Sequence, residues 1–496
     1  MEFFWQNIPF FCILLCIASA SFTSVLPRRA ARAVCMLVIT AVIAMSALLI
    51  SRVSAYGGWY TYSMGHFPAP WGNEIRAGLL EAVIALVFSV IMLLSLLGGL
   101  RRLNEHVFED KHNLYFIMLE LLLAALLAQV YTNDLFTAYV FVEIMTLTAC
   151  ALIIARSKGR TLVAATRYMI MNLMGSGLFL LGLCFLYDLT GHLLMSNIHE
   201  QVVSIASGDE IPRVLIVSAA LMSLGLAVKS ALFPFHTWLP DAYGYSTPTS
   251  SAVLSSLVSK GYIVLLIKIF YRVIGLDVIV RMRVNNVLFV FGLAGIIIGS
   301  LKAIREKDIR RMVSFSSVAQ IGYIFMGIGM GTEAGMVAAV FHIFVHGMAK
   351  SMLFLSTNGL VHVSGDSKLF RDLRGSGYRN PIAGVAFSVG SLSMVGIPFL
   401  GGFISKVYFA KAAMLMRPAE TVVVLLVLAA STFLNTIYFL KTVITLYRPS
   451  ETSAATYRPS PGFVLSTFCL VAANFALGTF SQPIIEAIRY GLHMFA

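Results

Sequence analysis

The stretch "KSALFPFHTWLPDAYGYSTPTS", residues 229–250, is polar and rich in proline, although apolar runs flank it on both sides. It brings Lys229, Pro234 and His236 close together in the chain. A proline removes one backbone hydrogen bond and crowds the preceding turn, so Pro234 predicts a break in a long apolar helix. Broken helices at membrane depth occur where they line a cavity or are buried in protein. We therefore expect a functional site at this break.

The composition of the whole chain is that of an integral membrane protein. Hydrophobic residues make up 58% of its 496 residues and charged residues 12%, whereas a soluble domain has about 25% charged residues. An open sheet edge in lipid would leave backbone groups unpaired, so helices should span the membrane. The early stretch "FWQNIPFFCILLCIASASFTSVLPRR" has no basic segment before its apolar run, and we expect a first spanning helix rather than a signal peptide. The predicted fold class is an all-α polytopic membrane protein.

The apolar runs predict about fourteen transmembrane helices, each near the roughly 20 residues that cross a bilayer. They are expected at residues 7–26, 33–52, 77–100, 114–132, 134–155, 162–187, 213–240, 246–271, 285–303, 310–330, 334–361, 381–411, 421–447 and 461–488. The longest polar connections, 53–75, 188–212 and 362–380, are too short for extramembrane domains.

Basic residues indicate the orientation of the bundle. The loops after odd-numbered helices contain "PRRAAR", "RSKGR", "KAIREKDIRR" and "KLFRDLRGSGYR", and loops rich in Lys and Arg face the cytoplasm. We expect a multi-pass protein of the cell membrane with both termini on the outer side. The net charge of +13 then belongs to cytoplasmic loops and predicts no nucleic-acid partner.

The cysteines predict no metal cluster. All six lie in apolar runs and no CxxC pair occurs, so we expect small buried apolar residues rather than iron–sulfur, zinc or disulfide sites. The glycines at 327, 329 and 331 follow no strand, which argues against a nucleotide site. The sequence predicts neither a cofactor nor a metal in this chain.

Ionisable side chains near the middle of the predicted helices are the strongest functional signal. A charge at the bilayer centre costs about 2.5–3.5 kcal/mol, so each needs a partner, water or a function. At about 1.5 Å per residue, a residue roughly ten positions from a helix end lies near the midplane. The residues selected in this way, with Lys406 nearer the outer end of its helix, are Glu143, Lys229, Lys260, His342, His346, Lys350 and Lys406.

Several of these residues have a purely structural alternative. Glu143 and Lys229 would form one buried salt bridge without further function. Lys260 and Lys406 would extend their side chains toward the membrane surface. His236 would only bond backbone groups that the prolines leave free.

Three ionisable residues of the predicted eleventh helix share one face. His342, His346 and Lys350 follow i, i+4, i+8 spacing. Two histidines at this spacing also occur at metal sites, but the sequence lacks the glutamate of the zinc-protease pattern and an evident third ligand. Glu81 and Glu120 lie near predicted helix ends, where we expect them to be partly hydrated.

A second proline break predicts an internal repeat. Pro398, in "GIPFLGGF", interrupts the twelfth predicted helix as Pro234 interrupts the seventh. Interrupted helices in corresponding positions point to an ion site in an inverted-repeat transporter. The spacing predicts inverted five-helix units, helices 4–8 and 9–13. The predicted division is 1–112, 113–273 and 274–448, followed by 449–496 with the last helix.

Five motifs carry a resemblance to one known family: "DLFTAYVFVE", "KSALFPFHTWLPDAYGYSTPTSSAVLSSLVSKGY", "KDIRRMVSFSSVAQIGY", "FHIFVHGMAKSMLFLSTNGL" and "GIPFLGGFISK". Over nearly its whole length the chain resembles the antiporter-like membrane subunits of respiratory complex I, of Mrp-type cation/proton antiporters and of membrane-bound hydrogenases. "FPAPWG", residues 67–72, is more similar to the Mrp and hydrogenase branch. "YGYSTPTSS" departs from the usual alanine- and proline-rich turn, and Glu120 matches no family position.

The resemblance implies fourteen helices with two inverted repeats and a line of proton-relay residues. It also implies a multisubunit complex with other membrane subunits, some of them antiporter-like, that moves protons or, alternatively, sodium. The implied roles are an ion pair of Glu143 and Lys229, a central Lys260, an eleventh-helix relay of His342, His346 and Lys350, and a terminal Lys406.

The predicted function is proton transfer along this line through water held by hydroxyl groups. Ser230, Thr249 and Ser314 are the candidates to hold that water, and His236 should border its path. No redox motif occurs in the chain, so partner subunits should supply the driving force. Two rival hypotheses remain: a stand-alone secondary antiporter, which would act without partners, and a non-conducting structural subunit, in which loss of Lys260 would leave transport intact.

Overall fold

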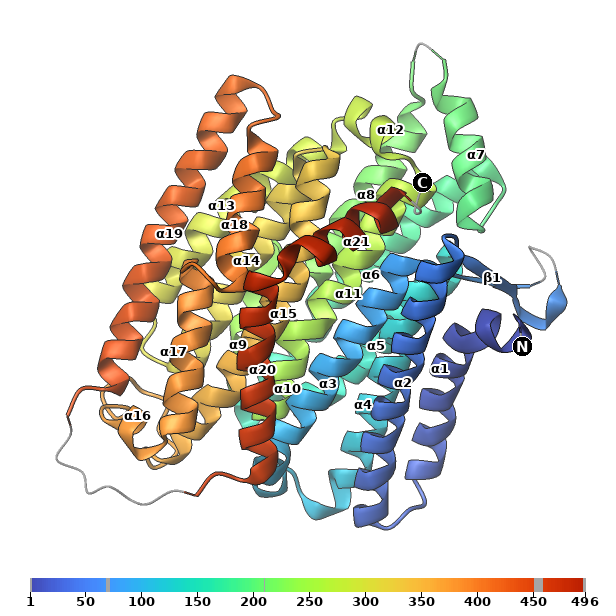
Figure 1. Ribbon diagram of the computed structural model, residues 1–496. Helices are drawn as coiled ribbons and strands as arrows, with labels where there is room; N and C mark the ends of the chain where they lie inside the picture. Colours follow the sequence, from blue (N-terminus) through green and yellow to red (C-terminus); the bar gives the residue numbers. More distant parts are fainter. Residues whose placement is uncertain (1, 68–71, 209, 450–457, 494–496) are drawn as a thin grey trace.

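The computed structural model describes residues 2–67, 72–208, 210–449 and 458–493 and consists mainly of long helices lying side by side (Figure 1). The predicted fold class, an all-α polytopic membrane protein, is confirmed. The described residues contain 12 helices long and apolar enough to cross a membrane. The other two of the fourteen predicted spans, 213–240 and 381–411, are those that contain the proline breaks.

The helices follow one another in the order that the apolar runs predict. In the first part of the chain they are α1 (Glu2–Thr23), α2 (Arg28–Tyr56), α3 (Leu79–His106), α4 (His112–Tyr131), α5 (Leu135–Ile154), α6 (Gly159–Thr190), α8 (Arg213–Lys229), α9 (Leu239–Tyr245), α10 (Pro248–Val253) and α11 (Ser259–Lys268). In the second part they are α13 (Val284–Arg305), α14 (Ile309–Gly329), α15 (Glu333–His362), α17 (Pro381–Val395), α18 (Gly401–Ala413), α19 (Pro418–Leu446), α20 (Pro461–Thr479) and α21 (Ser481–His493).

Both predicted helix breaks are confirmed. Helix α8 ends at Lys229, before Pro234, and the chain resumes as a 3₁₀ turn, Phe235–Trp238, and then α9. Helix α17 ends at Val395, and α18 begins at Gly401 after the turn that contains Pro398. Each break therefore leaves the carbonyl end of one helix inside the bundle.

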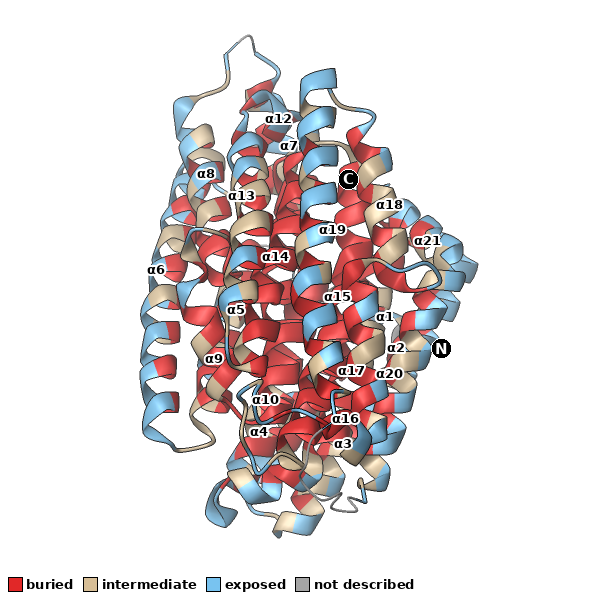
Figure 2. Ribbon diagram, turned by 90° about the vertical axis from the view of Figure 1, so that its left-hand side faces the viewer, coloured by how far each residue is buried: buried red, intermediate tan, exposed pale blue. Residues whose placement is uncertain are grey.

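The helices that carry Lys260, His342, His346 and Lys350 occupy the centre of the bundle. The segment 248–273 and helix α15 are buried throughout their most apolar windows, whereas only 33% of the corresponding residues of α2 and α19 are buried. Figure 2 shows the same gradient, with buried residues around α14 and α15 and exposed residues along the outer sides of α6 and α19. The ionisable residues on central helices are thus removed from the lipid.

Glycine allows two close helix contacts in this bundle. A Cβ on Gly225 of α8 would lie 2.6 Å from the carbonyl oxygen of Gly175 on α6, and a Cβ on Gly322 of α14 would lie 2.7 Å from that of Gly292 on α13. Small residues let membrane helices approach closely when no hydrophobic force between them is available. The first contact also presses α6 against Lys229, whose Cγ would lie 2.9 Å from a Cβ on Gly175.

Several connections hold more secondary structure than predicted. The connection 53–75 and its following residues form an antiparallel hairpin of β1 (Tyr60–Ser63) and β2 (Glu74–Ala77), in which Tyr60 pairs with Ala77. Two turns of 3₁₀ helix, η1 (Met64–His66) and η2 (Glu109–Lys111), lie in connections as well. Short helices α7 (Met195–Ala206), α12 (Leu276–Arg281) and α16 (Ser376–Arg379) occupy other connections.

The prediction of one continuous last helix over 461–488 is wrong. Helix α20 ends at Thr479, and the next helix, α21, runs obliquely across the bundle (Figure 1). Its residues are strongly amphipathic, with Ile485, Ile488 and Leu492 buried. His493 lies 3.3 Å from Glu333 at the start of α15. An amphipathic helix buries one face against the bundle and so leaves the direction of α20.

The predicted eighth helix is also irregular. Two π-helical segments, η4 (Leu254–Val258) and η5 (Ile269–Val273), flank α11. A π turn widens the hydrogen-bond pattern and is frequent at functional sites. The expectation that all cysteines are buried is wrong for Cys184, which is exposed on α6, and for Cys469, which is only partly buried.

Candidate functional site

Glu143 and Lys229 meet beside the first helix break. The Nζ of Lys229 lies 3.5 Å from Oε1 of Glu143 and donates a hydrogen bond of 2.9 Å to Oγ1 of Thr146. Lys229 is fully buried, whereas 26% of the Glu143 side chain is exposed. Ser176 of α6 donates to the Glu143 carboxylate. The structure therefore brings the predicted pair together and adds two hydroxyl groups to it.

An aromatic residue, Tyr262, also lies close to Lys229. Its Nζ lies 5.3 Å from the centroid of the Tyr262 ring, and the hydroxyl of Tyr262 lies 3.0 Å from Oγ1 of Thr146. Lys229 is also the last residue of α8. Helix carbonyl ends carry partial negative charge, so this position favours a cation.

Lys260 lies in α11 directly after the π-helical segment. Its Nζ donates to the carbonyl of Ser255 and, at 3.1 Å, to Oγ of Ser259. The lysine is fully buried, so it does not extend to the membrane surface as the structural alternative required. Ser230, next to Lys229 in the chain, donates to the carbonyl oxygen of Ser259 at 3.5 Å. Ser230 therefore links the segment of Lys229 to that of Lys260.

Helix α15 carries the three predicted relay residues on one buried face. The rings of His342 and His346 stack with centroids 6.0 Å apart. Nδ1 of His342 lies 2.6 Å from Oγ of Ser405 on α18. Lys350 donates to the carbonyl of Val313 at 3.0 Å and to Ser316 of α14. The face thus connects α14 to α18.

The histidines keep unused hydrogen-bonding capacity. Neither ring nitrogen of His346, nor Nε2 of His342, has a hydrogen-bond partner within the part of the chain that the structure describes. Buried polar groups normally have a partner, and water often supplies it. His346 lies within electrostatic range of both Lys260 and Lys350. These histidines are therefore suited to a hydrated path between the lysines.

Lys406 occupies the second helix break. Its Nζ donates to the carbonyl oxygen of Val395 at 2.6 Å and to Oγ1 of Thr432 at 2.9 Å. Val395 is the last residue of α17, so the lysine binds the carbonyl end of the broken helix. The side chain is partly buried and turns back into the break. This geometry disfavours the alternative in which Lys406 only reaches the membrane surface.

His236 has a partner that the sequence did not indicate. Its Nε2 lies 2.9 Å from Nζ of Lys302 on α13, and its ring stacks on Phe233 at 5.6 Å. His236 therefore joins the first break to the second half of the chain.

The three hydroxyl residues proposed to hold water are all buried. Ser230 and Ser314 donate within their own helices, to the carbonyls of Leu226 and Arg310 at 2.7 Å. Thr249 lies against α3, where a Cβ on Gly99 would come within 1.9 Å of its Oγ1. Of the three, Ser230 is the one that follows a predicted relay lysine in the chain and also donates to the residue before another, Ser259.

Several buried charges were missed or misjudged from the sequence. Lys268 is fully buried and donates to the carbonyls of Gln129, Val130 and Thr132 at 3.2, 2.9 and 2.5 Å, at the end of α4. It follows Lys260 by two turns on the same helical face, which was the signal that could have revealed it. Arg310 is equally buried and donates to the carbonyl of Ser246 at 2.8 Å.

The expectation that Glu81 and Glu120 are partly hydrated is wrong. Glu81 is 1% exposed because Arg272 covers it with an ion pair of 2.8 Å. Glu120 is 0% exposed and accepts a hydrogen bond of 3.1 Å from Thr23 of α1. Tertiary packing seals Glu81 near the start of α3, whereas Glu120 lies in the middle of α4 rather than near its end.

The fold, with two broken helices and buried acids and bases on its central helices, defines a class of polytopic membrane proteins. Residues 132–433 match the family model described as NADH:quinone oxidoreductase/Mrp antiporter, TM. The chain is 31% identical over 470 residues to NADH-quinone oxidoreductase subunit N of Desulforudis audaxviator, covering 91% of each chain. It is 25% identical over 446 residues to a subunit of the Na⁺/H⁺ antiporter of Bacillus subtilis, covering 88% of this chain and 86% of the relative.

Solved structures share the fold. The chain superposes with a TM-score of 0.88 and 23% identity on a chain of the membrane-bound sulfane sulfur reductase, an archaeal respiratory membrane complex, covering 99% of this chain and 98% of the other. The TM-score against a chain of the Mrp complex from Dietzia sp. is 0.87, also at 23% identity, with 98% and 97% covered.

This protein belongs to the NADH:quinone oxidoreductase/Mrp antiporter transmembrane family. The predicted family resemblance is therefore confirmed. The relatives named above come from both branches, and the preference for the Mrp and hydrogenase branch stays a prediction. The motif "FPAPWG" on which it depended lies largely outside the described residues.

Proposed function

We propose that this chain is a proton-translocating membrane subunit of a multisubunit complex, either redox-driven or of the Mrp antiporter type. The observation that carries the proposal is the line of buried ionisable groups that runs through both broken helices. It begins at Glu143 and Lys229, continues through Ser230 to Lys260, and reaches Lys406 through the α15 histidines. Relatives named as subunits of a quinone oxidoreductase and of a Na⁺/H⁺ antiporter support the assignment.

The chemistry of the line suits stepwise proton transfer. Burial disfavours the charged form of a lysine, whereas a neighbouring carboxylate stabilises it. Opening the contact between Glu143 and Lys229 would therefore change the proton affinity of Lys229. A proton released there would pass to Lys260 through hydroxyl groups and water. His346 and His342 would carry it toward Ser405 and the second break.

The proposal extends to the organisation and setting of the chain. The units 113–273 and 274–448 each contain one broken helix, as inverted repeats would require. The partners would be further membrane subunits, including antiporter-like ones, and the transported ion a proton, with sodium as the alternative. Both termini would lie on the outer side of the cell membrane. Redox cofactors would reside in partner subunits.

Reconstitution of the complex in vesicles tests the proposal. We expect Lys260→Ala to abolish formation of the pH gradient while the complex still assembles. Lys441→Ala, an exposed lysine at the end of α19, is the matched control and should pump normally. Unchanged pumping by Lys260→Ala would favour the alternative of a structural subunit. Transport by this chain reconstituted alone would favour the stand-alone antiporter.

A further inference from the structure

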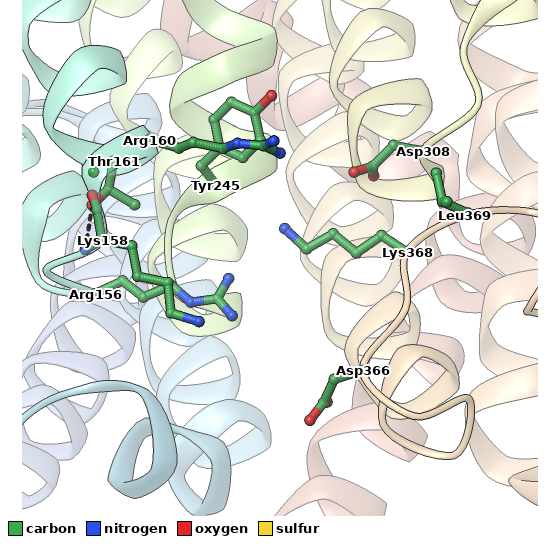
Figure 3. Close-up of a pocket in the computed structure, with 10 residues that line it drawn as sticks. Arg156, Lys158, Arg160, Thr161, Tyr245, Asp308, Asp366, Lys368 and Leu369 are labelled. Carbon is green, nitrogen blue, oxygen red and sulfur yellow. Dashed lines mark hydrogen bonds between the residues drawn. The ribbon is translucent and has the colours of Figure 1, made fainter.

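A basic cavity lies on the face that the Lys and Arg pattern predicts to be cytoplasmic. It has a volume of about 640 Å³ and lies between the start of α6 and the loop after α15. Figure 3 shows Arg156 and Lys158 extending from one wall and Lys368 from the other, with their terminal nitrogens pointing toward one another across the cavity. Arg160 and Tyr245 lie together at its edge, with Cζ of Arg160 5.8 Å from the centroid of the Tyr245 ring. The relay described above does not include these residues.

The acidic residues at this cavity are engaged elsewhere. Asp308 caps α14 by accepting hydrogen bonds from the backbone nitrogens of Arg310 and Arg311 at 2.8 and 3.2 Å. Asp366 accepts a charge-assisted hydrogen bond from Arg102. Four basic side chains therefore face the cavity, and both of its acids already have hydrogen-bond donors. The cavity has the charge of an anion site.

Two further features favour an anion. The first residues of the 32-residue helix α6, from Gly159 to Thr161, line the cavity, and helix N-termini attract negative charge. Burial, followed by the charge of Arg310, lowers the pKa of Lys368 to about 6. A bound anion would restore the charge of this lysine.

An apolar groove adjoins the cavity. It has a volume of about 250 Å³ and lies between α4 and α5, lined by Leu114, Met118, Ala151, Leu152 and Ile154 among others. Ser157 belongs to the groove, whereas its chain neighbours Arg156 and Lys158 belong to the cavity. One turn of the chain therefore borders both depressions, and on the groove side of it Lys111 donates to Ser157 at 3.3 Å.

We infer that this paired depression binds an anionic phospholipid, with the phosphate headgroup in the basic cavity and an acyl chain in the groove. A free phosphate would fill only the cavity and leave the groove unexplained. Basic pockets between membrane helices on the cytoplasmic side are suited to anionic headgroups. The lipid would contact both the turn after α5 and the loop after α15. Helix α5 is the helix that carries Glu143.

Lipid binding to the purified complex, measured by native mass spectrometry with added phosphatidylglycerol, tests the inference. The variant Arg156→Gln/Lys158→Gln/Lys368→Gln should bind this lipid roughly a hundredfold more weakly, because each basic residue near an anionic headgroup contributes about fivefold. The control is Arg305→Gln/Lys307→Gln/Arg371→Gln, which removes three exposed charges from the same face. Equal lipid binding by the two triple variants would overturn the inference.

A second arm separates a lipid from free phosphate. Ala151→Trp should fill the groove and weaken phosphatidylglycerol binding about tenfold, since large apolar contacts are lost. Leu114→Gln makes the same test at an exposed position of the groove. If both groove variants keep full lipid binding and inorganic phosphate displaces the lipid, the site takes soluble phosphate and the inference is wrong.

The pH dependence gives a third readout. Lys368 is surrounded by Arg310 and Asp308 at the start of α14 and by Arg156 and Lys158 before α6. Below about pH 6 Lys368 is charged without a ligand, whereas above that pH anion binding requires proton uptake. Affinity for phosphatidylglycerol should therefore fall as pH rises through this range, and Lys368→Gln should remove the dependence. A pH dependence that survives Lys368→Gln would contradict the role of this lysine.

Discussion

The two helix breaks hold their lysines in related positions but surround them differently. At the first break Lys229 ends α8 and lies 3.5 Å from the carboxylate of Glu143. At the second break Lys406 binds the terminal carbonyl of α17 and the hydroxyl of Thr432. Among the described residues no carboxylate forms an ion pair with Lys406. One lysine has a full negative charge as its partner, and the other has only dipoles.

This difference suggests different roles for the two breaks. A full charge changes the free energy of a buried cation more than neutral oxygens do, so movement of Glu143 would strongly alter the proton affinity of Lys229. Lys406 lacks such a partner, and it is bound instead by a carbonyl and a hydroxyl oxygen. We propose that the first break acts as the switch and the second as the site of proton exchange.

The largest expected effect comes from removing the charge at the first break. Glu143→Gln keeps the shape of the side chain but removes its charge. We expect the rate of proton translocation to fall below about a tenth of the wild-type rate, because a change of one pKa unit corresponds to about 1.4 kcal/mol. The measurement is the rate of pH-gradient formation in vesicles that contain the complex.

The control for this variant is Glu486→Gln, an exposed glutamate on α21. It should pump at the wild-type rate. If Glu143→Gln does so as well, the ion pair is structural and the proposed contrast between the breaks fails.

A second, smaller effect is expected at the other break. Lys406→Met retains the bulk of the stem and should lower ion translocation strongly, because the proposed terminal proton carrier is lost. Lys406→Glu should recover part of the activity, since a carboxyl also takes up and releases protons. Parallel pH-gradient and redox assays on one preparation separate lost pumping from lost assembly.

Lys411→Met provides the matched control on the same helix, because Lys411 is exposed. Wild-type pumping by Lys406→Met would show that protons leave the protein elsewhere. Failure of Lys406→Glu to recover any activity would mean that a positive charge is needed there rather than a proton carrier.

The smallest effects should follow from loss of single hydroxyl groups. Thr432→Val removes one of two acceptors from Lys406, whereas Thr146→Val leaves Lys229 its carboxylate partner. A hydrogen bond contributes about 1 kcal/mol net, so we expect a severalfold slower rate for Thr432→Val and a weaker effect for Thr146→Val. Initial pumping rates measured side by side give the order. The reverse order would contradict the contrast between charge and dipole partners.

The buried ionisable residues could be predicted because their chemistry is unusual for their setting. A lysine or histidine inside an apolar run is costly in lipid whatever surrounds it, so Lys260 and His346 stand out from the sequence alone. The helix breaks were predictable for a similar local reason, since proline prevents a regular helix at its own position.

Other charges could not be judged from their position along the helix. Glu81 was expected to be hydrated, and its burial depends on Arg272, which is far away in the chain. Lys268 was not selected, and its burial depends on the carbonyl end of α4. In both cases a distant segment decides whether a helix end meets water.

The sequence by itself determined an all-helical membrane protein, the places where two helices break and the main ionisable residues inside it. These properties follow from local costs: apolar surface in water, charge in lipid and proline in a helix. Only the tertiary structure decided that Lys229 meets a carboxylate, that Lys406 turns back to Val395, and that the basic turn after α5 faces Lys368. Those contacts join segments distant in the chain, and their geometry depends on how closely the helices pack.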